Sequence, residues 1–299
     1  MTSRNIRVSA YAFQGLWALT NRELKKWYKV PFLIFMSLVQ PVLWMGLFGK
    51  AMNIGGIFAY SVGTLPENIP PQMQQAFSEL LSDLSSEIMN KTFGTADYFS
   101  YMAVGMLAFI VLFTAMFSGM SIVWDRRLGF LNKVLTTPVA RGAVVMSKVF
   151  ASVIRSLVQS AVILSLALIL GLRLGPTFTP ISIIGVFGAM LLLSLGLSSI
   201  FITIAIRSSS WETQMAVMNL LNLPLLFASN ALFPIALMPK WIQSFAQINP
   251  VTHATDAARQ LLLYPLDYSR LLTDFAYLGV FATLFTSIGI VLSWRYLSR

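Results

Sequence analysis

The chain has 299 residues, of which 57% are apolar and only 11% are charged. A water-soluble protein of this length needs far more polar surface, so lipid is the solvent for most of this one. The formal charge of +10 comes from short basic clusters between long uncharged runs, a distribution that disfavours nucleic-acid binding. There is no cysteine, which excludes disulfides, thiolate metal ligands and a thiol nucleophile.

The first predicted element is an amphipathic helix over 10–29. Its apolar face carries residues at helical spacing: Phe13, Trp17, Thr20, Leu24 and Trp27. Its opposite face is basic: Arg22, Lys25, Lys26 and Lys29. A helix with this pattern lies on the inner leaflet of a membrane. It either anchors the first membrane span or acts mechanically at the surface of a partner, and the two roles are compatible.

Charge-free apolar runs mark the membrane spans, because about 20 apolar residues cross the hydrocarbon core of a bilayer. We predict an all-α integral membrane protein, with one transmembrane domain over 1–299 and six spans. The spans are 30–50, 98–124, 147–172, 181–206, 211–232 and 274–295. Gly175, Pro176 and Pro180 break the long run before the fourth span, so the third and fourth spans form a tight outer hairpin.

Basic residues indicate the orientation, since loops rich in Lys and Arg stay on the cytoplasmic side. With six spans both termini lie on one side, which holds fourteen basic residues against three acidic ones. The other side holds six basic residues against eight acidic ones. We therefore expect both termini in the cytoplasm.

Two segments are expected outside the cell. In 51–97 an apolar stripe predicts an amphipathic helix: Met73, Phe77, Leu80, Leu84 and Ile88. This helix either caps a transport pathway or packs on the outer ends of the spans. In 233–272, Pro234, Pro239 and Pro250 forbid one continuous helix, so broken re-entrant helices are expected. They either line an outer exit or form a structural hairpin.

Residues 125–142 form the predicted cytoplasmic loop between the second and third spans. A short basic helix is expected over 125–137, where Thr137 and Pro138 end it. Three apolar side chains share one face of this helix: Leu128, Leu131 and Leu135. Either the inner ends of the protein's own helices or a partner must cover that face.

The motifs of membrane enzymes are missing from the sequence. There is no His-Glu-x-x-His, no Gly-x-Ser-x-Gly and no pair of carboxylates within the predicted spans. The one histidine, His253, has Asp256 and Arg259 beside it, which form an intrahelical pair at least as easily as a catalytic set. Away from the ends of the spans, Arg155 is the one charged residue, which disfavours an ion-coupled carrier. No Gly-x-x-x-x-Gly-Lys-Ser/Thr loop is present, so another subunit must hydrolyse any ATP that is used.

Neutral polar side chains within the spans form one notable group: Gln159, Gln214, Asn219, Asn222 and Asn230. In lipid such side chains usually join helices, and they can also line a transport pathway. The two roles meet at a dimer interface. We therefore take four of them as candidates for a pathway or dimer interface: Gln214, Asn219, Asn222 and Asn230.

Two segments resemble the signature regions of type-2 ATP-binding-cassette (ABC) exporter permeases, in particular the daunorubicin-resistance, nodulation-factor and polysaccharide-export group. In 124–148 the matching residues are Trp124, Asp125, Arg126, Gly129, Phe130, Leu131, Leu135, Pro138, Val139, Arg141 and Lys148. In 232–262 they are Pro234, Pro239, Trp241, Asn249, Pro250, Thr252, Arg259 and Leu262. Arg127 stands where drug-efflux members usually carry an acid, and Lys133 makes the inner loop more basic still.

The resemblance implies the membrane permease of an ATP-driven exporter in the plasma membrane. Such a permease moves an amphipathic drug, lipid or glycolipid outward by alternating access. The implied partners are a second copy or a paralogous permease, and two ABC ATPase subunits that carry the ATP and Mg. No cofactor, metal or catalytic residue is implied for this chain. Two other classes stay open: a stand-alone membrane enzyme or scaffold, and a channel or carrier that works without nucleotide.

The resemblance also implies a role for the inner helix at 125–137 as the helix that couples the permease to the ATPase. Its apolar face is expected in a groove of the ATPase, with Asp125, Arg126 and Lys133 at the rim. The implied coupling residues are Asp125, Arg126, Leu128, Gly129, Leu131, Lys133, Leu135 and Pro138. The implied outer signature residues are Pro234, Pro239, Asn249, Pro250 and Arg259.

Overall fold

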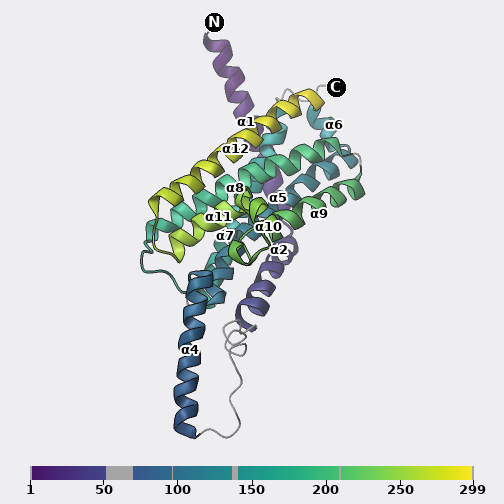
Figure 1. Cartoon of the computed structure of the whole chain (residues 1–299). Coiled ribbons are helices and arrows are strands. Elements are labelled where there is room, and N and C mark those ends of the chain that lie inside the picture. The colour runs from purple at the N-terminus through teal and green to yellow at the C-terminus, as the bar shows by residue number, and fades with distance from the viewer. Residues whose placement is uncertain (1, 52–69, 96, 137–140, 209, 298–299) are drawn as a thin grey trace.

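The computed structural model describes residues 2–51, 70–95, 97–136, 141–208 and 210–297, and every regular element in those ranges is a helix (Figure 1). The predicted all-α class is confirmed. Residues 52–69 and 96 of the expected external segment, and Pro138 of the inner loop, lie outside the described residues.

Four helical stretches of the described chain are long and apolar enough to cross a membrane. They contain four long helices: α5 (Tyr98–Arg127), α7 (Arg141–Ile169), α8 (Pro180–Arg207) and α12 (Tyr268–Leu297). These helices coincide with the second, third, fourth and sixth predicted spans. Each extends beyond the uncharged run at one end or both, because a helix continues into polar residues after the apolar stretch ends.

The first and fifth predicted spans correspond to shorter helices. The run at 30–50 forms α2 (Pro31–Trp44) and then a π-helix, η1 (Met45–Ala51). Pro41 lies inside α2, and its missing N–H loosens the hydrogen-bond ladder one turn before the π-helix begins. The run at 211–232 forms α9 (Trp211–Phe227), which has only 17 residues. Membrane crossing by these two segments remains a prediction.

α5 is the central helix of the bundle. Every residue from Tyr98 to Leu112 is buried, and the helix packs against α7, α8, α9 and α11. Two glycines allow α5 to approach the backbone of neighbouring segments closely. A Cβ on Gly105 would clash with the carbonyl of Ala231, and one on Gly119 would lie 2.7 Å from the carbonyl oxygen of Phe201 in α8. Small residues let helix backbones meet in this way in membrane proteins.

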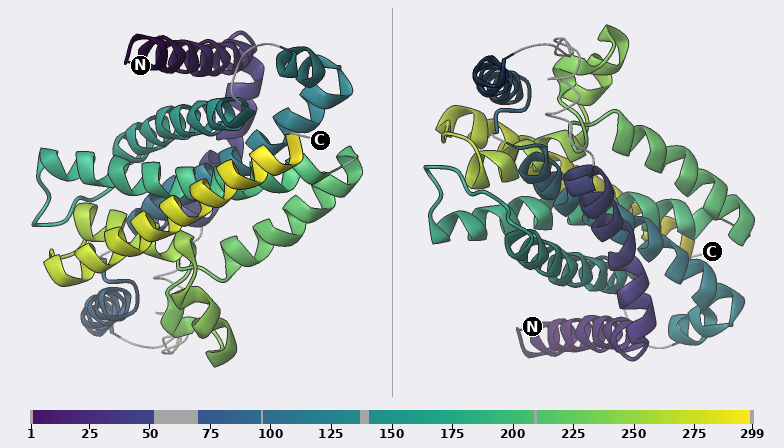
Figure 2. Two further views of the ribbon diagram at one scale, coloured as in Figure 1. Left: turned by 90° about the horizontal axis from the view of Figure 1, so that it is seen from above. Right: turned by 90° about the horizontal axis from the view of Figure 1, so that it is seen from below.

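α1 (Thr2–Tyr28) runs across the direction of α8 and α12 and lies at the outside of the bundle (Figures 1 and 2). It packs against α7, where the hydroxyl of Thr20 lies 3.4 Å from the carbonyl oxygen of Ser147. Leu19 of α1 also contacts the cluster around Leu131. The C-terminal half of α1 therefore packs beside α6 and the start of α7, at the end of the bundle that the sequence analysis places in the cytoplasm, which we call the inner end.

The inner connection differs from the single helix predicted over 125–137. α5 continues to Arg127, Gly129 then adopts a left-handed conformation with φ of 69°, and a separate helix, α6, covers Phe130–Leu135. Glycine allows this turn because it has no Cβ. Asp125 and Arg126 consequently belong to the last turn of α5 rather than to the short inner helix.

At the opposite end, α4 (Pro71–Phe93) projects from the bundle (Figure 1). The chain between α9 and α12 forms three short helices: η2 (Ile235–Leu237), α10 (Lys240–Gln247) and α11 (Pro250–Leu262). Pro239 directly precedes α10 and Pro250 opens α11, positions where a missing N–H costs little. The prolines therefore begin helices at this end instead of interrupting one.

We expect Gly105→Ala to lower the thermal stability of the detergent-purified chain, because the added methyl group collides with backbone rather than with a flexible side chain. Overpacking of this kind costs about 1–3 kcal/mol. The measurement is the midpoint of thermal unfolding, and Gly279→Ala is the matched control because nothing lies within 4 Å of its Cβ position. Equal midpoints for the two variants would show that α5 and the 228–231 turn are not in close contact.

Candidate functional site

A cluster of five charged residues, three of them buried, joins three helices at the inner end. The inner ion cluster consists of Arg22, Glu23, Lys26, Asp125 and Lys148. The Asp125 carboxylate lies 2.6 Å from Lys148 Nζ, 2.9 Å from Lys26 Nζ and 3.3 Å from Arg22 Nη2. Glu23 Oε1 lies 3.0–3.3 Å from the same three cations. The cluster thus connects α1 with the last turn of α5 and the second turn of α7.

Burial makes these pairs structurally important. The side chains of Glu23, Asp125 and Lys148 are only 3–4% exposed, and a buried charge is costly unless partners replace its hydration. Lys148 has a partner for each of its three ammonium hydrogens, since it also bonds the Ser121 hydroxyl at 3.1 Å. Loss of one member would therefore leave other charges buried without a partner.

Arg126 lies in the same last turn of α5 as Asp125, but its side chain bonds a different helix, α8. Its guanidinium donates to the carbonyls of Ile206 at 2.5 Å and Ser208 at 2.8 Å. Those carbonyls lie at the end of α8, where no helical partner remains for them. Asp125 and Arg126, both expected at an ATPase rim, are thus engaged within their own chain. The sequence could not indicate this, because all of their partners except Lys148 are 80 or more residues away.

The three leucines expected on one face are not equivalent in the structure. Leu131 is 5% exposed and packs with Val134 and Val144, so the chain's own helix ends cover it. Leu128 is 75% exposed and stands at the α5–α6 junction. Lys133 is also exposed, whereas the side chain of Leu135 is outside the described set. The exposed residues in the described part of the inner loop are Arg127, Leu128, Lys133 and Thr136, and Gly129 between them is half-buried.

Hydroxyl groups form a polar ladder between α5, α7 and α8 that the sequence analysis missed. Ser152 of α7 hydrogen-bonds Ser118 of α5 and Ser198 of α8, both at 2.7 Å. The Ser156 hydroxyl donates to the Ser194 hydroxyl at 2.8 Å. The available signal was the four-residue spacing of Ser152, Ser156 and Ser160 along α7, which places them on one helix face. Ladders of this kind join helices in lipid.

Two further members of the polar ladder had been noted for other reasons. Gln159 accepts from Thr114 at 2.5 Å and donates to Ser37 of α2 at 2.5 Å. Arg155 donates to the Ser118 hydroxyl at 3.2 Å and to the Ala151 carbonyl at 3.1 Å. The one charged residue away from the ends of the predicted spans thus contacts the ladder instead of a paired carboxylate.

The polar residues expected together on the fifth span divide into two sets. Gln214 is fully buried, and neither its amide nitrogen nor its oxygen has a hydrogen-bond partner within the described chain. Asn222 is 6% exposed with its oxygen likewise unpartnered, and Asn219 is exposed. Asn230 lies beyond the end of α9 and belongs to the outer end. The predicted four-residue group therefore does not converge within one chain.

Arg259 organises the outer end. It is 1% exposed, and its guanidinium donates to the carbonyls of Tyr101, Asn230 and Ala231 at 2.8–3.0 Å. The same group lies 3.4 Å from the centroid of the Tyr101 ring, a cation–π arrangement. Arg259 thereby fixes α11 to α5 and to the turn after α9. Tyr101 was missed in the sequence, where it is one of many aromatic residues in an apolar run.

Asn249 connects the two helices on either side of the outer break. Its side-chain oxygen accepts from the Val251 N–H, which caps the start of α11. Its amide nitrogen donates to the carbonyls of Leu225 and Ala228 at the end of α9. Pro234 and Pro239 flank the short η2 helix. The outer signature residues thus have structural partners within the chain.

His253 also has partners that explain it structurally. Its Nδ1 lies 2.8 Å from the Asp274 carboxylate and its Nε2 lies 2.9 Å from the Gln247 carbonyl oxygen. The ring stacks on Tyr277 with centroids 3.9 Å apart. Nearby Asp256 accepts from Asn230 and Arg270, while burial raises its pKa. Among the described residues no group of three His, Cys, Asp or Glu side chains is placed to hold a metal.

The long apolar helices and internally paired polar groups define a multi-pass helical membrane protein. The sequence profile of the family described as ABC-2 type transporter matches residues 14–263, and the chain belongs to that family. The resemblance seen in the two signature segments is confirmed.

Named relatives agree with this membership. The putative transport permease ycf38 of Cyanophora paradoxa is 27% identical over 254 residues, which are 85% of this chain and 76% of the relative. Its counterpart from Pyropia yezoensis is 26% identical, over 83% of this chain and 74% of the relative. The daunorubicin resistance ABC transporter permease protein DrrB1 of Streptomyces coeruleorubidus is 29% identical over 171 residues, 56% of this chain and 59% of the relative.

We expect Asp125→Asn to destabilise the chain by about 3–5 kcal/mol, because three cations then share a single remaining carboxylate. The loss is measured as a fall in the midpoint of thermal unfolding in detergent. Lys133→Gln is the control, since Lys133 is exposed on neighbouring α6 and exposed charges contribute about 0–1 kcal/mol. A variant as stable as the control would contradict the structural role of the inner ion cluster.

Arg259→Lys should destabilise the chain although it keeps the charge. A single ammonium cannot reproduce the fork that reaches three carbonyls on two segments, and each buried carbonyl left unpaired costs about 1–3 kcal/mol. Arg270→Gln serves as the matched control, because the Arg270 side chain is 64% exposed. The readout is again the unfolding midpoint, and a harmless Arg259→Lys would show that charge alone matters there.

Proposed function

We propose that this chain is the membrane permease of an ATP-driven exporter, and that it moves an amphipathic drug, lipid or glycolipid outward by alternating access. The observation that carries the proposal is the ABC-2 family match over 14–263. The names of the relatives, two transport permeases and a daunorubicin resistance permease, support export of an amphipathic compound. Six spans in the plasma membrane, with both termini in the cytoplasm, complete the proposal.

The proposed partners are two ABC ATPase subunits, which bind ATP and Mg, and a second copy of this chain or a paralogous permease. Permeases of this family generally pair with an ATP-binding subunit. This chain then contributes no hydrolytic chemistry. Its residues transmit movement between the ATPase and the spans.

The proposed contact with the ATPase is the accessible part of the inner loop. Leu128 offers an exposed apolar side chain beside the turn at Gly129, and Lys133 offers an exposed charge on α6. Behind this surface, Asp125 bonds α1 and α7 while Arg126 bonds the end of α8. Displacement of α6 is therefore passed to four other helices through direct contacts, a physically continuous route.

The proposed pathway or dimer interface lies along α9. Gln214 and Asn222 carry buried polar atoms that lack partners within the described chain, and Asn219 is exposed near them on the same helix. Unpaired polar atoms are costly in a membrane protein. Asn219 is directly accessible to a second permease or a hydrated pathway, and a movement of α9 that opened its packed face would give Gln214 and Asn222 the partners that they lack.

The experiment is to purify the tagged chain from its native membranes and measure whether an ABC ATPase co-elutes with it and hydrolyses ATP. Leu128→Glu should reduce co-elution by at least tenfold, because a charge replaces an apolar contact at the centre of the proposed surface. Leu237→Glu is the control, since Leu237 is an equally apolar residue that is 54% exposed at the outer end.

If the ATPase co-eluted equally well with Leu128→Glu, the coupling contact would not be at Leu128. Purification of a folded chain that never retains an ATPase would refute the exporter. The two alternative classes, a membrane enzyme and a channel, each predict an activity of the isolated chain. A membrane enzyme would show turnover that is lost in His253→Ala, and an autonomous channel would conduct without nucleotide.

A further inference from the structure

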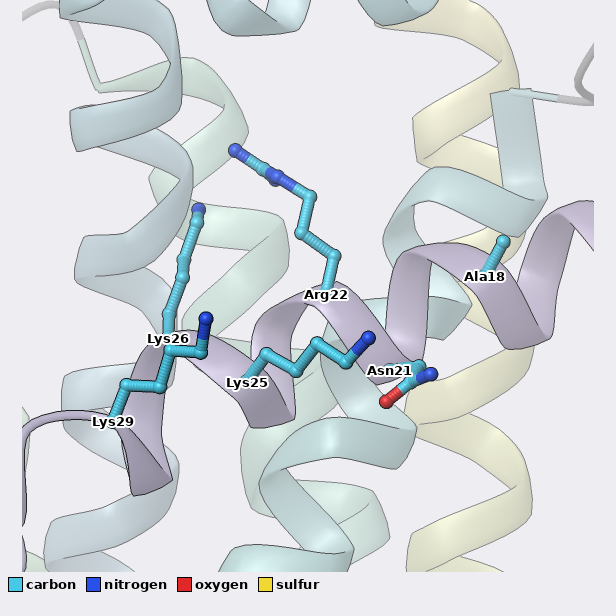
Figure 3. Close-up of a pocket in the computed structure, with 6 residues that line it drawn as sticks. All are labelled: Ala18, Asn21, Arg22, Lys25, Lys26 and Lys29. Carbon is cyan, nitrogen blue, oxygen red and sulfur yellow. The ribbon is translucent and has the colours of Figure 1, made fainter.

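A basic hollow lies along α1 next to the inner ion cluster. It measures about 510 Å³ and is lined by Ala18, Asn21, Arg22, Lys25, Lys26 and Lys29 (Figure 3). The lining residues recur at intervals of three and four, so they share one side of the helix. In Figure 3 the Arg22 and Lys26 side chains point away from α1 toward neighbouring helices, while Lys25 lies along the helix toward Asn21.

The charges around this hollow do not balance. Arg22, Lys26 and Lys148 share the two carboxylates of Glu23 and Asp125, which already leaves one positive charge. Lys25 and Lys29 add two more, are exposed, and form no ion pair with any carboxylate of the described chain. Three positive charges are therefore available to an anion. No comparable excess of negative charge is offered by the helices that pack on α1.

The hollow also lies where α1 meets apolar surface. Tyr28 at the end of α1 is 52% exposed, and the helix that follows directly exposes Phe32 at 63% and Phe35 at 62%. Aromatic and basic residues side by side are characteristic of the boundary between headgroups and hydrocarbon. An anion bound in the hollow would thus have exposed apolar side chains beside it.

We propose that the α1 hollow is a binding site for one anionic phospholipid of the inner leaflet. The phosphate group would accept hydrogen bonds from Lys25 and Lys29, beside the net positive charge of the inner ion cluster, and the acyl chains would lie along the exposed side chains of α2. Phosphate oxygens suit this set because charge-assisted bonds from several donors are strong, and basic residues near a membrane surface attract anionic lipids. A lipid seated there would hold α1 against the leaflet beside the charges that hold it to α5 and α7.

The test titrates the full chain, purified and delipidated in detergent, with phosphatidylglycerol or phosphatidylcholine and counts bound lipid by native mass spectrometry. We expect selective retention of phosphatidylglycerol. Lys25→Gln with Lys29→Gln should weaken it about 25-fold, since each basic residue near a membrane contributes about a fivefold effect. Lys91→Gln with Lys240→Gln is the matched control, because both lysines are exposed at the outer end.

A second variant distinguishes lipid binding in the hollow from nonspecific electrostatic attraction. Ala18→Leu keeps every charge but fills part of the hollow, so it should weaken phosphatidylglycerol retention by at least threefold. Ala276→Leu, an equally exposed position on α12, should leave retention unchanged. Retention that depends on charge but not on Ala18 would overturn the site and indicate diffuse attraction.

Two other outcomes would also overturn the proposal. If inorganic phosphate displaced the lipid at equal concentration, the hollow would be a site for small anions. If the double lysine variant kept its lipid but lost a co-eluting ATPase, the hollow would be a protein contact. Failure of the exporter proposal would not affect the result, because lipid binding is measured on the chain alone.

Discussion

Burial of charge in an apolar bundle is the constraint on which the rest of this structure depends. A charged group removed from water persists only where other groups replace its hydration. At the inner end, carboxylates and cations from three helices pair with one another, and these ion pairs replace the lost hydration. At the outer end, backbone carbonyls of two other segments accept the hydrogen bonds of Arg259 in place of water. Each arrangement therefore fixes parts of the chain that no local sequence preference would bring together.

The outer arrangement explains how a broken helix is tolerated beside the bundle. The end of α9 leaves carbonyls without helical partners, and irregular backbone at this depth requires the protein to supply donors. Asn249 supplies them to Leu225 and Ala228, while Arg259 supplies them to Asn230 and Ala231. The break and its two donor side chains form one structural unit, which gives Asn249 and Arg259 of the outer signature a structural role.

The sequence allowed much of this structure to be predicted, for identifiable reasons. Long uncharged runs located α5, α7, α8 and α12, since lipid imposes a minimum apolar length. Proline positions indicated separate short helices near 233–272. The sequence did not predict that Leu131 would be covered internally, because three leucines at helical spacing do not reveal what faces them. Nor did it place Asp125 beside Lys26, since that contact joins residues 99 positions apart.

Asp125 and Arg126 together explain how the inner end can behave as one body. They are neighbours in the last turn of α5, yet their side chains reach opposite groups of helices, α1 with α7 for the first and α8 for the second. The polar ladder of Ser118, Ser152 and Ser198 joins α5, α7 and α8 again, two turns deeper. Two connected levels resist relative rotation far better than one. A force on the α5–α6 junction is therefore expected to tilt α1, α5, α7 and α8 as a unit.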